Sequence, residues 1–219
     1  MGLSKIINDI LKGNEMHSSK ARHYTDDVLR KQTPKVTLVL CSDSRIADGI
    51  FGFEKFNYAF CIRDIGNQIL TAEGSVDYGV LHLKTPPLMI VGHTGCGAIK
   101  ASLGDYSKET IGIRKELDSL KKTREGHFNG EELLKEARYS QKNVDAQVEY
   151  AVKKYKNLVD SGDLVVIGAM FDMHGVLSGK KGKIYITNIN SEKDEKSIKS
   201  SDVFLGIEKG IVENSVRRI

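Results

Sequence analysis

The chain has 219 residues, of which 40% are hydrophobic and 28% are charged, a composition typical of a globular protein with a sizeable core. Its formal net charge is only +4, and Lys and Arg are interleaved with Asp and Glu, which argues against a concentrated surface for nucleic acid. No apolar run is long enough to span a membrane, and the N-terminus lacks the apolar core of a signal peptide. We therefore expect a cytoplasmic protein, a single domain over residues 1–219, that binds neither nucleic acid nor a membrane.

The N-terminal segment has the spacing of an amphipathic helix. Its apolar residues recur at i, i+3, i+4, i+7 and i+8, namely Leu3, Ile6, Ile7, Ile10 and Leu11. Gly13 is expected to end this helix. We predict a helical arm over about residues 1–30, ahead of the first strand.

Five further runs are predicted to be strands. Four of them are nearly continuously apolar, as is typical of parallel strands that are covered on both faces; they lie at 35–40, 58–62, 87–92 and 163–170. The fifth run, 183–188, alternates between apolar and polar residues and is expected to be an antiparallel edge strand.

Helical patterns lie between these runs. We predict helices at 74–84, at 143–162 with Gly162 as its end, and at 203–216 as a closing helix. The charged stretch at about 105–140 is expected to be an exposed helical insertion, and residues 179–202 a polar hairpin and solvated linker. Strands that alternate with helices predict an α/β fold with right-handed crossovers.

Two polar turns follow predicted strands, "CSDSR" (41–45) after the first and "HTGCG" (93–97) after the third. In α/β sheets, ligands bind outside the carboxyl ends of the strands. Cys41, His93 and Cys96 would supply two thiolates and one imidazole, a ligand set that suits zinc. Three protein ligands leave a fourth position open, which is typical of a catalytic zinc site.

Asp43 and Arg45 lie beside this group in the sequence. Asp43 is two residues from Cys41, close enough to reach the fourth position of the metal or to hydrogen-bond a water there. Arg45 is placed to hold Asp43 by a two-pronged ion pair. We therefore predict that Asp43 alternates between metal ligand and hydrogen-bond acceptor.

Other interpretations of the cysteines are open. A cysteine phosphatase needs five residues between its Cys and Arg, whereas three separate Cys41 from Arg45, and that reading leaves Cys96 unexplained. A four-ligand structural zinc would need another thiol, for which Cys61 is the candidate. Because Cys61 lies within an apolar strand run, we expect it to be simply buried.

The two turns, together with "IRDIGN" (62–67) and "GSVDYGVLHLK" (74–84), closely resemble the β-class carbonic anhydrases, from residue 11 to residue 182. The resemblance implies that Cys41, His93 and Cys96 bind one Zn²⁺ per chain, with the Asp43–Arg45 pair beside the metal. It also implies a mixed, mainly parallel sheet of order 2-1-3-4 with an antiparallel fifth strand at the edge, flanked by helices. Such chains associate as dimers or multiples of dimers.

The plant-type members of the family imply a substrate pocket formed by Gln32, Phe60, Ile65, Tyr78 and Gly97. Ile65 stands where those members have Val, and Asp64 stands where Asn is commoner, with no role assigned to it. In the family, part of this pocket comes from the neighbouring subunit, so we expect a monomer to have an incomplete site.

The resemblance implies the reversible hydration of carbon dioxide to bicarbonate and a proton. Zinc lowers the pKa of its bound water, and the resulting zinc-bound hydroxide attacks the carbon. We expect Asp43 to orient this nucleophile and Gln32 to donate a hydrogen bond to a substrate oxygen. His82 and His174 are candidate proton relays, although solvated or packed histidines are the favoured interpretation.

Two alternatives remain open from the sequence. Carbonyl sulfide and carbon disulfide hydrolases are built on the same framework, and pocket width would distinguish them. A zinc-bearing scaffold without turnover is the other, which Asp43 and Arg45 argue against, because a structural zinc site has no use for them.

Overall fold

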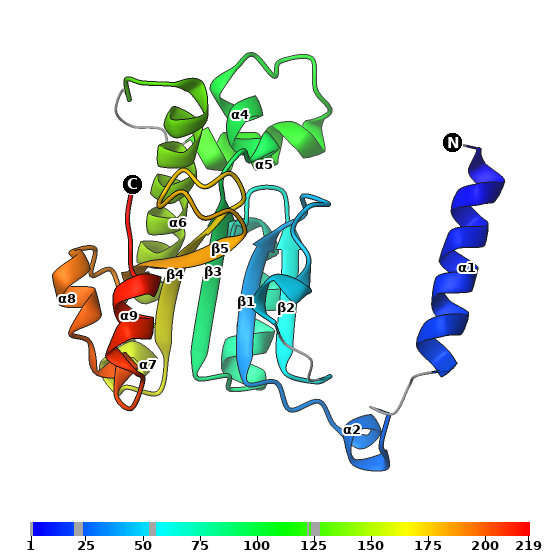
Figure 1. The fold of residues 1–219 in the computed structure, drawn as a ribbon, viewed down its shortest axis with the longest axis horizontal. Helices are drawn as coiled ribbons and strands as arrows, with labels where there is room; N and C mark the ends of the chain where they lie inside the picture. Colours follow the sequence, from blue (N-terminus) through cyan, green and yellow to red (C-terminus); the bar gives the residue numbers. More distant parts are fainter. Residues whose placement is uncertain (1, 20–23, 53–55, 122, 124–127) are drawn as a thin grey trace.

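A five-stranded sheet of order β2-β1-β3-β4-β5 lies at the centre of the computed structural model, which describes residues 2–19, 24–52, 56–121, 123 and 128–219 (Figure 1). The strands are β1 (Val36–Cys41), β2 (Ala59–Asp64), β3 (Pro87–His93), β4 (Val165–Asp172) and β5 (Lys183–Ile189). The first four are parallel, and β5 runs antiparallel to β4. The predicted mixed, mainly parallel α/β sheet is confirmed, and each strand lies within two residues of its predicted bounds.

The continuous apolar runs form strands because both faces of the sheet are covered. All six residues of β1 are buried. Leu38 and Leu40 pack in one apolar cluster with Val91, whereas Val39 packs in another with Ile90. Alternate residues of a strand point to opposite faces, so a strand that is buried on both sides has no polar alternation.

Helix α6 (Glu132–Lys154) covers one face of the sheet along β3 and β4. Two strand glycines allow its close approach. A Cβ on Gly92 would lie 2.6 Å from Val144 Cγ2, and a Cβ on Gly168 would lie 2.8 Å from Val144 Cγ1. The same cluster includes Val76 of α3 (Glu73–Asp77) and Val80 of the π-helical turn η3 (Tyr78–His82).

The remaining elements are short. Figure 1 shows α4 and α5 together above one end of the sheet, at the point where β3 runs into α4. These elements are α2 (Asp26–Arg30), η1 (Asp48–Phe51), η2 (Leu70–Ala72), α4 (Gly97–Leu103), α5 (Ile111–Lys121), α7 (Lys156–Asp160), α8 (Glu195–Lys199), η4 (Asp202–Phe204) and α9 (Lys209–Ser215).

The N-terminal helix differs from its prediction. Helix α1 spans Leu3–Ser19 and continues through Gly13, where we expected it to end. A glycine inside a helix costs about 1 kcal/mol relative to alanine, which weakens a helix without forbidding it. None of the residues of α1 is buried, and Figure 1 shows the helix standing apart from the sheet.

The expectation of an exposed insertion over 105–140 is wrong in part. Helix α6 begins inside that stretch, at Glu132, and buries Ala137 and Tyr139. Helix α5 buries Leu117 and Leu120, so the charged sequence conceals an apolar face. The predicted helix at 143–162 is likewise two helices, because the backbone departs from helical geometry at Tyr155, between α6 and α7.

The C-terminal predictions also need correction. The closing helix expected at 203–216 is the short turn η4 followed by α9, with Gly206 between them at φ +81°. The stretch expected to be a solvated linker contains α8, in which Ile198 is fully buried. Asp194 begins α8 by accepting a hydrogen bond from the backbone N–H of Ser197 at 2.8 Å.

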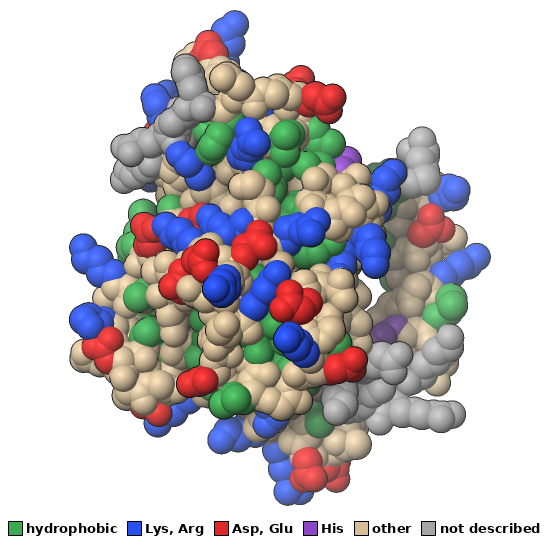
Figure 2. All heavy atoms as spheres, turned by 60° about the vertical axis from the view of Figure 1, so that its left-hand side comes forward, with side chains coloured by type: hydrophobic (Ala, Val, Ile, Leu, Met, Phe, Trp, Pro, Cys, Tyr) green, Lys and Arg blue, Asp and Glu red, His purple; other side chains and the backbone are tan. Residues whose placement is uncertain are grey.

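Charge is distributed evenly over the face that Figure 2 shows. Lys and Arg side chains alternate there with Asp and Glu, as the sequence predicts. Within the part of the chain that the structure describes, no helix has both the length and the apolar character that a membrane span needs.

Candidate metal centre

The carboxyl ends of β1 and β3 bring three metal-ligating side chains together. Cys41 is the last residue of β1, His93 is the last residue of β3, and Cys96 immediately precedes α4. Because β1 and β3 are neighbours, their ends meet at one edge of the sheet. The ligand atoms of the three residues lie within 4.8 Å of one another, and all three residues are buried.

The geometry fits a tetrahedral zinc ion. The sulfurs of Cys41 and Cys96 are 3.9 Å apart. Two Zn–S bonds of about 2.3 Å at a tetrahedral angle would place the sulfurs about 3.8 Å apart. His93 Nδ1 lies 3.2 Å from the carbonyl oxygen of Thr94, whereas its Nε2 is buried without a hydrogen-bond partner among the described residues. Nε2 is therefore the nitrogen left for a metal.

The two thiols have different proton affinities. A hydrogen bond from Cys96 is the largest cause that lowers the pKa of Cys41, to about 4. The same hydrogen bond, together with burial, raises the pKa of Cys96. The backbone N–H of Gly66 also donates to Cys41 Sγ at 3.4 Å. Without a cation the pair therefore keeps one proton, which a bound cation would displace.

A layer of apolar side chains packs against the two cysteines. The two cysteines belong to one cluster with Leu117 and Leu120 of α5, and with Ile99 and Tyr139. A shell of this kind excludes water from the ligands and strengthens the electrostatic interactions inside it.

Asp43 and Arg45 form the predicted pair. Arg45 donates to the Asp43 carboxylate through Nε at 2.9 Å, through Nη2 at 2.6 Å and through its backbone N–H at 3.0 Å. These bonds hold the pKa of Asp43 well below its usual range. Arg45 Nη2 also donates to the carbonyl of Gly95 at 2.9 Å, which ties the first polar turn to the second.

Arg63 is a residue that the sequence analysis did not single out. From β2, its guanidinium donates to the carbonyls of Cys41 and Asp43, each at 3.1 Å from Nη2, and to that of Ile46. It therefore fixes the path of the first polar turn. The signal in the sequence was a charged residue at the end of an apolar strand run.

Comparison with known proteins agrees with this geometry. A family model described as "Carbonic anhydrase" matches residues 36–178, which is more than half of the chain and includes both polar turns. The chain belongs to the β-class carbonic anhydrase family.

Curated relatives match over shorter segments. A carbonic anhydrase of Mycolicibacterium smegmatis is 34% identical over 92 residues, covering 42% of this chain and 45% of the relative. Carbonic anhydrase 2 of Mycobacterium tuberculosis is 30% identical over 100 residues, covering 45% of this chain and 48% of the relative. The chain thus spans about half the length of the curated relatives it matches.

Solved structures share the fold. One of two tetrameric β-carbonic anhydrases from Sordaria macrospora aligns with a TM-score of 0.68 at 24% identity, covering 84% of this chain and 94% of that chain. A Coccomyxa β-carbonic anhydrase in complex with acetazolamide aligns with a TM-score of 0.69 at 21% identity, covering 91% of both chains. At these identities the likeness is one of fold alone.

Two of the five pocket residues expected from the carbonic anhydrase family lie near the metal ligands. Ile65 is half-buried and immediately precedes Gly66, whose N–H donates to Cys41. Gly97 follows Cys96 as the first residue of α4, and no atom outside its chain neighbours and its own helix backbone would lie within 4 Å of a Cβ there.

The other three lie toward the opposite end of the sheet. Phe60 pairs in register with Thr37, four residues before Cys41, a separation of about 13 Å along a strand. The ring of Tyr78 is 5.8 Å from that of Phe60, and Gln32 is exposed ahead of β1. One chain therefore does not bring Gln32, Phe60 and Tyr78 to its own metal ligands.

The remaining candidate residues from the sequence, two histidines and a cysteine, likewise differ in whether they lie beside the metal ligands. His82 stacks on Tyr78 with ring centroids 4.5 Å apart, whereas His174 lies against the second polar turn, with Nδ1 2.8 Å from Thr94 Oγ1. Cys61 is half-buried on β2 and is not part of the metal-ligating group, which removes it as a fourth ligand.

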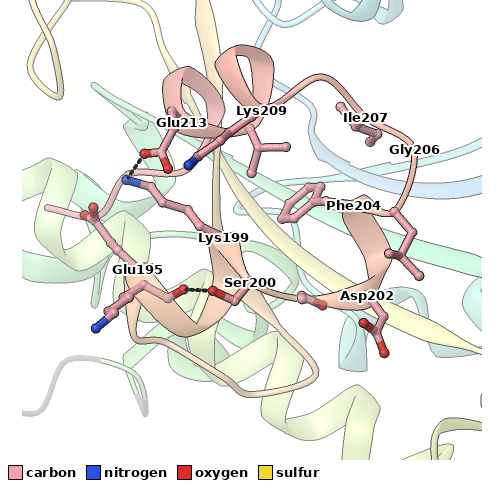
Figure 3. Close-up of a pocket in the computed structure, with 13 residues that line it drawn as sticks. Glu195, Lys199, Ser200, Asp202, Phe204, Gly206, Ile207, Lys209 and Glu213 are labelled. Atoms are coloured by element: carbon pink, nitrogen blue, oxygen red, sulfur yellow. Dashed lines mark hydrogen bonds and ion pairs between the residues drawn. The ribbon is translucent and has the colours of Figure 1, made fainter.

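A hollow of about 730 Å³ lies elsewhere, between α8 and α9 (Figure 3). Its polar groups are partly paired with each other. Lys199 Nζ lies 3.1 Å from Glu213 Oε2, and the hydroxyl of Ser200 donates to the carbonyl of Lys196 at 3.0 Å. We assign this hollow no ligand.

Proposed function

We propose that the chain is a zinc-dependent carbonic anhydrase, which catalyses the reversible hydration of carbon dioxide to bicarbonate and a proton. One observation carries this proposal, the buried group of Cys41, His93 and Cys96 with the Asp43–Arg45 pair beside it. Membership of the β-class family supports the reaction. A zinc ion held by these three residues would supply Lewis acidity, lowering the pKa of a bound water from 15.7 towards about 7.

The side chains around the metal ligands have separate tasks. Asp43 stays ionised, so its carboxylate accepts a hydrogen bond from the attacking water and orients its lone pair toward the carbon. Arg45 holds that carboxylate by its two-pronged ion pair and keeps it away from the metal, so that in this arrangement Asp43 acts as a hydrogen-bond acceptor and not in its alternative role of metal ligand. Ile65 provides an apolar wall, which suits a linear, uncharged substrate.

A second copy of the chain would complete the pocket. Gln32, Phe60 and Tyr78 do not reach the metal ligands of their own chain, and Tyr78 is 43% exposed. We propose that these residues serve the site of a neighbouring subunit in a dimer or a multiple of dimers, with Gln32 donating to a substrate oxygen.

The free cysteines favour a reducing compartment such as the cytoplasm.

Stopped-flow measurement of carbon dioxide hydration tests the proposal, on protein of known zinc content between about pH 6.5 and pH 9, where zinc makes a water acidic enough to react. We expect rapid hydration that rises with pH. Asp43→Ala should lower the rate by about a hundredfold, because an oriented proton acceptor contributes about that factor. Asp202→Asn, on the exposed turn η4, is the control. Protein with one zinc per chain and no measurable hydration would overturn the proposal.

A further inference from the structure

The peptide group that joins Ile65 to Gly66 points its N–H at a metal ligand. This N–H donates to Cys41 Sγ at 3.4 Å. Gly66 has φ +85°, and a Cβ there would lie 2.8 Å from Leu120 Cδ1. A residue with a side chain rarely adopts such a φ, so the backbone takes this path because residue 66 is a glycine. The direction of the N–H is therefore set by the turn that follows β2.

Gln68 holds the other end of that peptide group. Its Nε2 donates to the carbonyl of Ile65 at 2.9 Å, to the carbonyl of Glu116 at 3.2 Å and to the carboxylate of Glu116 at 3.1 Å. All three partners are acceptors, so the amide nitrogen of Gln68, and not its oxygen, must face them. Gln68 is fully buried. Inside a protein, a carbonyl that accepts a hydrogen bond makes the N–H of the same peptide group a stronger donor.

Two amides of α6 hold the next peptide group. Asn143 Nδ2 donates to the carbonyl of Gly66 at 2.8 Å, and Asn143 Oδ1 accepts from Gln147 Nε2 at 3.1 Å. Gln147 Oε1 accepts the backbone N–H of Ile69 at 2.9 Å. Because a backbone N–H can only donate, this bond fixes the orientation of both amides. Both amide residues are buried, so the turn is held on either side of Gly66 by side chains shielded from water.

We propose that Gln68 and Asn143 are positioning residues of the metal centre, which hold the Gly66 N–H against the Cys41 thiolate. An N–H bond to a thiolate withdraws charge from the sulfur and fixes its direction, so a cation bound there remains a stronger Lewis acid. The ligand set contains two thiolates, each of which gives the cation more negative charge than an imidazole does. This inference rests on the metal site of the proposed function and not on the hydration reaction.

Cobalt substitution tests the inference, because Co²⁺ accepts the same thiolate and imidazole ligands and its sulfur-to-metal charge-transfer band reports the electron density on the sulfur. The decisive variant is Gln68→Met, which has a similar length and no donor. We expect its band to move to lower energy, because a thiolate with a weaker hydrogen bond gives up an electron more easily. Zinc affinity, measured by competition with a chelator, should fall about tenfold or more, because Cys41 is no longer held in one direction.

Gln141→Met is the matched control. Gln141 is a buried amide residue of α6, and its Oε1 accepts the backbone N–H of Ile219 at 2.9 Å. The same exchange there also removes a buried hydrogen bond, so we expect it to lower the free energy of unfolding. It should leave the cobalt band and the zinc affinity as in the wild type. The control thus separates a loss of stability from a change at the metal.

The cobalt band decides between the outcomes. An unchanged band in Gln68→Met overturns the inference, whatever happens to stability, and assigns Gln68 to the fold alone. A shift of the same size in Gln141→Met also overturns it. If Gln68→Met does not fold, Asn143→Leu replaces it with the same expected shift, because it removes the bond to the Gly66 carbonyl. Wild-type protein that binds neither cobalt nor zinc ends both proposals, whereas metal binding without hydration ends only the proposed function.

Discussion

Replacing Asp64 with asparagine should stabilise the protein at neutral pH. Asp64 ends β2 and pairs in register with Cys41. Its carboxylate accepts hydrogen bonds from the backbone N–H of Gln68 at 2.8 Å and from the hydroxyl of Thr71 at 2.5 Å. Burial is the largest cause that raises the pKa of Asp64, to about 6.

The size of the expected stabilisation follows from the pKa of Asp64. A rise from 3.8 to about 6 corresponds to about 3 kcal/mol of preference for the protonated form in the folded state. A raised folded pKa contributes stability that is fully present below the unfolded pKa of about 4 and is lost as pH rises through the folded pKa of about 6. At pH 7 the contribution of Asp64 is therefore gone.

Asparagine has the shape and hydrogen-bonding pattern of protonated Asp64. Its amide oxygen accepts from Gln68, and its NH₂ group donates to the hydroxyl oxygen of Thr71. We expect Asp64→Asn to match the wild type near pH 4 and to exceed its free energy of unfolding by about 2 to 3 kcal/mol at pH 7. Urea unfolding of the wild type and of Asp64→Asn between pH 4 and pH 7 measures the difference in free energy of unfolding. Contributions that are common to both proteins cancel in this difference.

The control is Asp202→Asn, which introduces the same amide at an exposed position. Its difference from the wild type should be small and independent of pH. A difference for Asp64→Asn that does not change between pH 4 and pH 7 would refute the reasoning, and so would a variant less stable than the wild type at pH 7.

Two packing predictions concern close contacts, one beside the pocket residue Phe60 and one beside the metal ligands. In Gly79→Ala, the new Cβ would lie 2.2 Å from Thr37 Oγ1, so we expect a loss of about 1 to 3 kcal/mol in urea unfolding, largely relieved by adding Thr37→Ala. Leu120→Ala removes a fully buried side chain from the apolar layer that packs against Cys41 and Cys96. We expect the free energy of unfolding to fall by about 2 to 5 kcal/mol and zinc to be lost faster to a chelator. An unchanged free energy of unfolding in either variant would contradict the packing described.

The sheet and the metal ligands were predictable because each depends on local sequence. The run at 35–40 is apolar at nearly every position, and a strand covered on both faces requires that. Cys41, His93 and Cys96 each fall at or just after the end of such a run, so parallel strands alone bring them to one edge of the sheet.

Other features were not evident from the local sequence. The length of α1 beyond Gly13 was missed because a glycine weakens a helix without ending it. The start of α6 at Glu132 was missed because the charged stretch was interpreted as a separate exposed helix, whereas α6 buries Ala137 and Tyr139 by tertiary packing. The contact of His174 with Gly95 joins segments 79 residues apart. A histidine after a strand carries no sign of which turn it will touch.

The two polar turns are held mainly from neighbouring strands. Arg63 of β2 holds the turn after β1, Arg45 from that turn holds Gly95, and the turn after β4 presses His174 on the same glycine. Each contact depends on the parallel register that aligns Leu40 with Arg63 and His93 with Phe171. A slip of one residue would turn every side chain of a strand to the other face, so the sheet register determines the geometry of the metal centre.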